Sequence, residues 1–331
     1  MLTLPVPRGP LTEWLVERLT APPSALIAAP DADGDEDLQL ALYLCYELHY
    51  RGLPGVDDRW EWQPSLLEVR RRLEERFEAE LLVAVPREAE EVAPEEMDLA
   101  LRAIDDADDG PSLSRFLERD GTLAQFREFL AHRSAYQLKE ADPHSWALPR
   151  IWGAPKAAMV EIQADEYGGG RAERIHAQLF ANAMAALDLD ARYGAYVDHL
   201  PAVTLRTVNL MSLCGLHRRL RGAIIGHLAL FEMTSSIPNR RYGDGLRRLG
   251  FSGDATDFFD EHVEADAVHE AVAAVDLAGG LVRQDPSLCG DVLWGARCLA
   301  RVEADWGNVV LAAWEDGASS LRAPLDDPVA A

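Results

Sequence analysis

Apolar residues recur every three to four positions along most of this 331-residue chain, which is the period of an α-helix with one buried face. The clearest case is residues 65–82, where the apolar spacing is accompanied by opposite charges three and four positions apart. Runs in which apolar and β-branched residues alternate, as in a half-buried strand, are scarce. The pattern therefore predicts an all-α protein.

Prolines, glycines and acidic loops divide this pattern into separate helices. Within residues 112–146 we expect two helices, the second of which runs through Glu140 and is stopped by Pro143. Residues 201–235 are expected to form a helix that ends before Pro238. The other expected helices are 38–50, 65–82, a long pattern at 156–190, 258–270 and 291–315. Gly168, Gly169 and Gly170 interrupt the long pattern. Three helical glycines cost about 3 kcal/mol relative to alanine, so we expect a kink or bulge there.

The composition is that of an ordinary globular protein, but its formal net charge is −24. Such a charge argues against binding to nucleic-acid backbones and to anionic membranes. No apolar run reaches the length of a membrane span, and the N-terminus lacks the pattern of a signal peptide, so we expect a cytoplasmic location. The four cysteines show no CxxC spacing, which indicates neither a disulfide framework nor a zinc ribbon.

Candidate metal chemistry is concentrated in residues 258–270. His262, Asp266 and His269 are spaced i, i+4 and i+7, which places them within roughly 60° of one another on a helix. Two neutral imidazoles and a carboxylate suit iron, manganese or zinc better than calcium or magnesium. The alternative is a solvated helix face that carries histidines without binding a metal.

A carboxylate-bridged dinuclear iron site in a helical bundle needs about four carboxylates and at least two histidines from several helices. Asp266-x2-His269 supplies one carboxylate–imidazole pair, and Glu173-x2-His176 is the counterpart that spacing suggests. These pairs agree with a site for two iron ions.

Two further carboxylates stand in strongly apolar surroundings. Glu232 lies in GHLALFEMTSS and Glu140 lies in AYQLKEADPHSW. Because burying an unpaired carboxylate is costly, acids in such settings are seldom left without a partner, and a bound metal accounts for both.

Three segments of the sequence resemble a known family. The segment EHVEADAVHE, together with KEADPHSWALPRIWGAPKAAMVEIQADEYGGG and RRLRGAIIGHLALFEMTSS, is similar to the ligand-bearing blocks of the haem-oxygenase-like diiron oxidases and oxygenases, and the resemblance covers about residues 130–275. It implies a haem-oxygenase-like bundle of about seven helices that binds two irons instead of haem. Carried over position by position, it implies metal ligands at Glu140, Glu166, His176, Glu232, His262, Asp266 and His269.

Spacing and resemblance disagree about the carboxylate that accompanies His176. Spacing favours Glu173, whereas the resemblance implies Glu166, which would lie about 80° away from His176 on a regular helix. A bulge at the glycine triplet would absorb that misfit, and helix distortions often occur at functional sites. We therefore favour Glu166, with Glu173 as a surface residue and with Asp165 and Glu161 beside the ligands or on the surface.

The resemblance also implies the function. We expect an enzyme that uses O2 and two iron ions to abstract hydrogen from an amino acid or an amino-acid-derived small molecule, leading to desaturation, cyclisation or C–C cleavage. The alternatives are N-oxygenation of an amine or guanidine, and iron binding or storage without a substrate. An external electron donor is compatible with each reaction. Leu228, Phe231 and Met233 are the candidates for the substrate-binding wall.

The domain organisation that we expect has three parts. Residues 1–125 form an N-terminal helical extension that packs on the bundle or serves homodimerisation, residues 126–320 form the catalytic bundle, and residues 321–331 form a loose tail.

Overall fold

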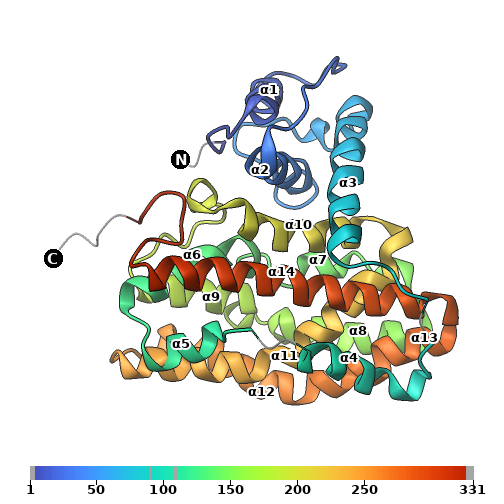
Figure 1. The fold of residues 1–331 in the computed structure, drawn as a ribbon, viewed down its shortest axis with the longest axis vertical. Helices are drawn as coiled ribbons and strands as arrows, with labels where there is room; N and C mark the ends of the chain where they lie inside the picture. The colour runs from blue at the N-terminus through green and yellow to red at the C-terminus, as the bar shows by residue number, and fades with distance from the viewer. Residues whose placement is uncertain (1–3, 90, 108–109, 326–331) are drawn as a thin grey trace.

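The computed structural model describes residues 4–89, 91–107 and 110–325, and within these ranges the chain forms helices and no β-strand (Figure 1). The all-α prediction is confirmed. None of the described helices is both long enough and apolar enough to cross a bilayer.

Two long helices form the centre of the bundle. Helix α11 (Arg221–Arg248) packs along α14 (Cys289–Glu315). At Gly226 a Cβ atom would lie 1.8 Å from the Val292 carbonyl oxygen, and at Gly295 it would lie 2.0 Å from the Ala223 carbonyl oxygen. Glycine is therefore required at both positions, because the two backbones approach too closely for any side chain.

The remaining bundle helices surround this pair. They are α6 (Leu123–Gln137), α7 (Asp142–Ser145), α8 (Gly153–Glu166), α9 (His176–Ala186), α10 (Ala202–Leu216) and α12 (Asp257–Ala271). Helix α12 packs against α11 and continues into a π-helix at Val272–Gly279, followed by α13 (Gly280–Gln284). Helical distortions of this type often accompany functional sites.

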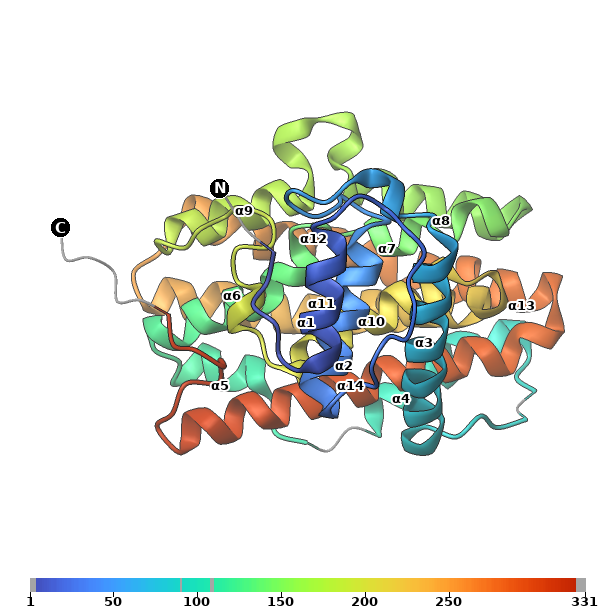
Figure 2. The same cartoon turned by 90° about the horizontal axis from the view of Figure 1, so that it is seen from above.

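The N-terminal helices fall on two sides of the bundle. Helices α1 (Pro10–Leu19), α2 (Gly34–Glu47) and α3 (Pro64–Ala84) lie together beyond α10 (Figures 1 and 2). Helices α4 (Met97–Asp106) and α5 (Leu113–Arg119) pack against α11. One apolar core includes side chains of α2 and α10, such as Leu42 and Leu205. The division at residue 125 therefore stays a prediction.

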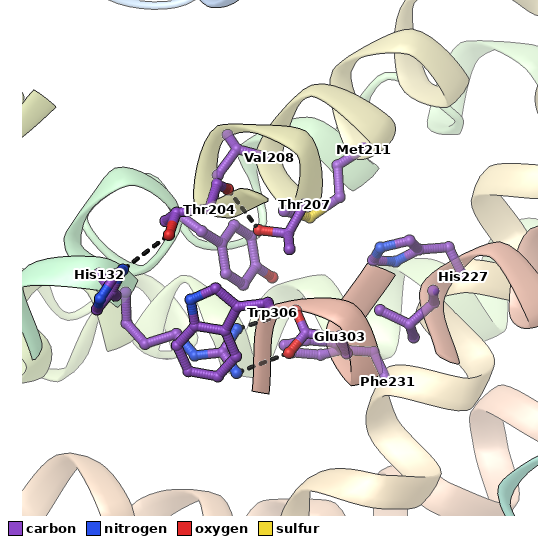
Figure 3. Close-up of a pocket in the computed structure, with 12 residues that line it drawn as sticks. His132, Thr204, Thr207, Val208, Met211, His227, Phe231, Glu303 and Trp306 are labelled. Carbon is purple, nitrogen blue, oxygen red and sulfur yellow. Dashed lines mark hydrogen bonds and ion pairs between the residues drawn. The ribbon is translucent and has the colours of Figure 1, made fainter. Parts of the chain in front are cut away.

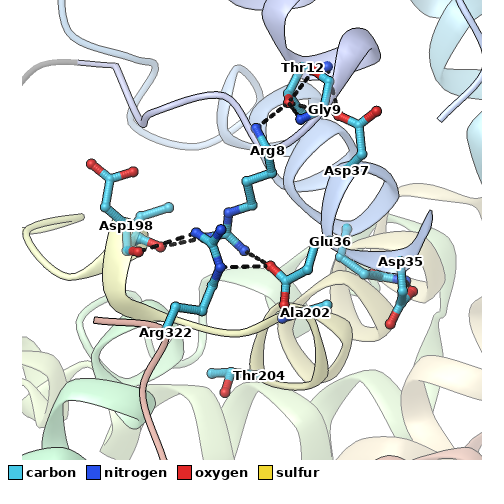
Figure 4. A network of polar contacts seen from close by, with 12 residues as sticks. Arg8, Gly9, Thr12, Asp35, Glu36, Asp37, Asp198, Ala202, Thr204 and Arg322 are labelled. Carbon is cyan, nitrogen blue, oxygen red and sulfur yellow. Dashed lines mark hydrogen bonds and ion pairs between the residues drawn. The ribbon is translucent and has the colours of Figure 1, made fainter. Parts of the chain in front are cut away.

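A polar network also joins the N-terminal segment to the bundle (Figure 4). Glu36 of α2 accepts hydrogen bonds from Arg8 at 2.8 Å and from the backbone N–H of Ala202 at 2.7 Å. Near the other end of the chain, Leu321 is buried and the backbone N–H of Arg322 donates to the His199 carbonyl at 2.9 Å.

Two predicted helix ends are wrong. The helix expected to run through Glu140 ends at Gln137, and Pro143 lies in the first turn of α7 instead of stopping the preceding helix. Proline is well tolerated in a first turn, where its missing N–H has no intrahelical partner to lose. Glu140 consequently lies in the turn between α6 and α7.

The segment expected as one helix at 201–235 is two helices. The backbone is extended at His217, which separates α10 from α11, and α11 runs through Pro238 instead of ending before it. A side-chain bond from the Asn239 amide to the Ser235 carbonyl, 3.0 Å long, supports the helix beside the proline. Packing of α11 along α12 and α14 thus outweighs the local cost of proline.

Candidate metal centre

The predicted ligands converge in the interior of the bundle. Glu140, Glu166, His176 and His262 form one group, Glu166, Glu232 and His269 form another, and within each group the candidate ligand atoms lie within 4.8 Å of one another. All six side chains are buried. Glu166 belongs to both groups. The side chain of Asp266, the seventh predicted ligand, lies outside the described residues.

In the first group, Glu140 comes from the turn after α6 and His262 from α12. The His262 Nδ1–H donates to the Phe258 carbonyl at 2.8 Å, one turn earlier in the same helix. This bond fixes the ring and the tautomer, so that Nε2 can act as a ligand. His262 Nε2 lies 3.5 Å from Glu140 Oε1.

The glycine triplet brings Glu166 and His176 together. Glu166 is the last residue of α8 and His176 the first of α9, and the chain between them is a loop with two 3₁₀ turns and not a bulge within one helix. Gly168 has a left-handed φ of 68°, and a Cβ there would lie 2.6 Å from the backbone of Arg174 and of Ile175. Only glycine permits this close return of the chain.

The loop places Glu166, and not Glu173, beside His176. Glu166 Oε2 lies 3.0 Å from His176 Nδ1, whereas the Glu173 side chain is exposed. The spacing argument for Glu173 assumed a continuous helix, but residues 172–174 form a separate 3₁₀ turn. Periodicity has no meaning across such a break.

The donor atoms of the first group fit a metal ion. Glu166 Oε2, His176 Nδ1 and Glu140 Oε2 are buried and have no hydrogen-bond partner, although the first two are 3.0 Å apart. Two neighbouring ligands at right angles around an ion, with bonds of about 2.1 Å, are separated by about 3.0 Å. Because burying Glu140 Oε2 without a partner is costly, and because Glu166 and His176 stand at the separation of two ligands, a cation between these atoms is the chemistry that the arrangement supports.

The second group lies between α11, α12 and α8. His269 Nδ1 is 3.3 Å from Glu232 Oε2, and on the other side of the ring His269 Nε2 is 3.0 Å from Asp165 Oδ2. Asp165 was expected beside the ligands or on the surface; its side chain is 61% exposed and contacts the imidazole. An imidazole between a metal and an outer carboxylate is the usual arrangement for a histidine ligand.

The electrostatics reflect unlike charges enclosed together. Burial raises the pKa of Glu140. Burial also acts to raise the pKa of Glu166, but the neighbouring imidazoles, chiefly that of His176, hold it at about 2. Burial lowers the pKa of His269, but the Glu232 carboxylate and its neighbours outweigh burial and raise it to about 9. The cluster thus pairs carboxylates with imidazoles. A bound cation would provide the positive charge that protons on the imidazoles provide without it.

A narrow cavity adjoins both groups. Its wall includes four of the candidate ligands and, besides them, Tyr136, Ala141, His144, Gln163, Leu228, Phe231 and Ser235. In this structure it has room for about one water molecule. Leu228 and Phe231 were expected there, whereas Met233 packs against the apolar core.

Sequence reasoning did not single out Tyr136, His144 or Gln163. A signal existed for the first two, since Tyr136 lies one helical turn before Glu140 and His144 one turn after it. His144 Nε2 is 3.1 Å from His227 Nδ1, and burial lowers the pKa of His144 to about 4.

A second cavity shares Tyr136 and Phe231 with the first (Figure 3). Arg133 and Glu303 face each other in its wall, joined by two hydrogen bonds of 2.9 and 2.7 Å. The Arg133 guanidinium also lies 3.9 Å from the ring centre of Trp306. A matched positive and negative group therefore line the space next to the candidate metal centre.

A helical bundle with carboxylates and imidazoles gathered in its interior defines the class of carboxylate–histidine metalloproteins. Residues 127–304 match the family of iron-containing redox enzymes, and the chain belongs to this family. The match spans all seven predicted ligands and confirms the family that the sequence resembles. No curated protein matches the chain.

Proposed function

We propose that this iron-containing redox enzyme holds two iron ions per chain and uses O2 to oxidise a small molecule. The observation that carries the proposal is the position of Glu166, which lies within ligand distance of both groups of buried donors. A carboxylate shared by two sets of ligands is the arrangement by which dinuclear iron sites hold their ions close together.

The proposed ligands divide between the two ions. Glu140, His176 and His262 would hold the first ion, Glu232 and His269 would hold the second, and Glu166, which belongs to both groups, would contribute to both. Asp266 joins this set from the family resemblance. Imidazole and carboxylate donors of this mixture suit ferrous iron and leave positions open for O2.

Bound ferrous iron would supply coordination positions for O2 and pass electrons to it. The surrounding side chains control access to that chemistry. Tyr136, Leu228 and Phe231 provide an apolar wall that limits water, and the narrow cavity means that side chains move when a substrate binds. Gln163 donates to the Ala141 carbonyl at 3.2 Å and so braces the turn that carries Glu140.

The substrate that we propose is an amino acid or a close derivative. The Arg133–Glu303 pair lines the second cavity and offers one charge of each sign to a zwitterion, with Arg133 suited to a carboxylate and Glu303 to an ammonium group. Because Tyr136 and Phe231 border both cavities, a substrate held at this pair would extend its side chain toward the metal centre.

Electron balance sets a requirement on the reaction. Desaturation, like ring closure by loss of two hydrogens, takes two electrons from the substrate, whereas reduction of O2 to two water molecules takes four. An external reductant must therefore supply the other two electrons in each turnover. We propose such a donor as a partner of the enzyme.

Iron analysis and oxygen uptake test the proposal. Protein loaded anaerobically with Fe(II) should contain two irons per chain, and one amino acid in a screen of free amino acids should accelerate its O2 consumption. The product mass separates the reaction types, because N-oxygenation adds an oxygen atom and desaturation removes two hydrogens. Two irons with no acceleration by any amino acid or derivative would indicate iron binding without the proposed chemistry, and Glu166→Gln is the control for site-dependent uptake.

A further inference from the structure

The turn that carries Glu140 is strained. Ala141 adopts a left-handed φ of 73°, which is unfavourable for any residue other than glycine. Glu140 Oε2 has no hydrogen-bond partner. Strained backbone of this kind persists only where the surroundings enforce it, so other contacts must hold the turn.

An ion pair from the N-terminal helix α2 reaches this turn. The Lys139 side chain is fully enclosed and pairs with Glu47, the last residue of α2, whose side chain is 1% exposed. The Tyr193 hydroxyl donates to the other carboxylate oxygen of Glu47. The Lys139 ammonium also lies 4.1 Å from the ring centre of Tyr50, a cation–π distance.

A second contact from the same segment holds the preceding residue. Arg51 donates from Nη2 to the Leu138 carbonyl at 2.7 Å. Its guanidinium stacks on the ring of Tyr193 at 4.4 Å, which fixes its direction. The two residues before Glu140 are therefore both anchored by the chain between residues 47 and 51.

We propose that Glu47 and Arg51 are positioning residues for Glu140, so that the N-terminal segment completes the binding site of the first iron ion. Both residues lie outside the region 127–304 that matches the family. The inference rests on the proposed function, because it takes Glu140 to be an iron ligand. Neither residue touches the metal; each acts by holding the turn.

Stability alone does not account for the Lys139–Glu47 pair. Burying two charges costs about as much as their attraction returns, and well-packed apolar side chains of similar volume often stabilise a protein equally. A pair with fixed geometry does restrict the position of the backbone that carries it. Changes to residues that orient metal ligands typically reduce metal affinity about 10- to 100-fold.

The test separates positioning from stability with three variants of the full chain. Glu47→Gln removes one charge of the pair. The double variant Glu47→Met with Lys139→Met removes both charges and keeps the volume, which guards against failure to fold. Glu36→Gln is the matched control, because it weakens another polar junction between α2 and the bundle, one that involves none of residues 138–141 (Figure 4). Each metal-free protein is titrated anaerobically with Co(II), followed by visible absorption, and its melting temperature is measured.

We expect wild type to bind two Co(II) ions, and both Glu47 variants to bind one of them at least tenfold more weakly while the other is unchanged. The double variant should keep this defect with a melting temperature near that of wild type, and Glu36→Gln should bind both ions normally even if it melts earlier. Wild-type affinity for both ions in folded Glu47 variants would overturn the positioning role alone. A wild-type protein that binds no metal would overturn the proposed function and the inference with it.

Discussion

Glu166 Oε2 and His176 Nδ1 lie 3.0 Å apart, although the two residues belong to different helices and a loop separates them. The loop depends on a backbone contact at Gly168 that leaves no room for a Cβ atom. The geometry of the candidate centre is thus linked to a glycine that has no side chain to contribute.

Gly168→Ala should reduce iron affinity at least tenfold, because the added methyl group would push Arg174 and Ile175 away and displace His176. Gly169→Ala is the matched control. Alanine at this left-handed φ of 59° costs about 1 kcal/mol, but its Cβ would meet no atom within 4 Å. Iron titration of both variants checks the prediction, and equal affinities would contradict it.

Glu166→Gln should lower the iron content from two ions per chain to fewer than one, because the shared carboxylate supports both groups of donors. Glu232→Gln should leave about one ion, since Glu232 belongs to one group only. Glu173→Gln, at an exposed carboxylate nearby, should leave both. Elemental analysis after anaerobic loading measures all three, and a normal iron content in Glu166→Gln would remove the bridging role.

Asp165→Asn should weaken binding of the second ion about 10- to 100-fold, because the carboxylate that orients His269 through Nε2 loses its charge. Glu161→Gln carries the same change of charge one turn earlier on α8 and should have no effect. Competition with a chelator of known affinity measures the difference. If both variants lose affinity equally, the cause is surface charge and not orientation of His269.

His132 should make the metal-free protein sensitive to acid. Burial lowers its pKa from 6.5 to about 3, and its ring nitrogens face the hydroxyls of Thr204 and Ser320. Since the folded pKa lies below the unfolded one, the unfolded chain binds the extra proton as the pH falls through 6.5 toward 3, and stability is lost in that window.

Between pH 7 and pH 5 this one group should lower the free energy of unfolding by about 2 kcal/mol. His132→Gln removes the titrating ring, so the difference in unfolding free energy between wild type and this variant should shrink by that amount over the same pH range. Urea unfolding at the two pH values measures it. A deficit independent of pH would show that His132 does not titrate as its burial requires.

Arg133→Gln should raise the KM for the proposed amino-acid substrate at least tenfold and leave the iron content unchanged, because the guanidinium lines the proposed substrate cavity without belonging to either group of candidate ligands. Arg301→Gln, at an exposed arginine on the same helix as Glu303, is the control and should leave KM unchanged. Steady-state oxygen uptake measures both. An unchanged KM in Arg133→Gln would place the substrate carboxylate elsewhere.

Local periodicity predicted those parts of the candidate centre that lie within one continuous helix. His262 and His269 were expected on one face of a helix at 258–270, and both are buried side chains of α12 that face different groups of ligands. The apolar surroundings of Glu140 and Glu232 also indicated burial correctly, because an acid whose sequence neighbours are apolar is buried together with them.

The sequence by itself determined the helical class, the acidic surface and the types of residue available to bind a metal, because these follow from short-range periodicity and composition. Only the tertiary structure placed Glu166 instead of Glu173 beside His176, placed Glu140 in a turn, and joined Lys139 to Glu47 across 92 positions. Such contacts depend on where helices end and how they pack. No short-range pattern encodes this, because loops and helix packing bring together residues whose spacing along the sequence carries no periodic relation.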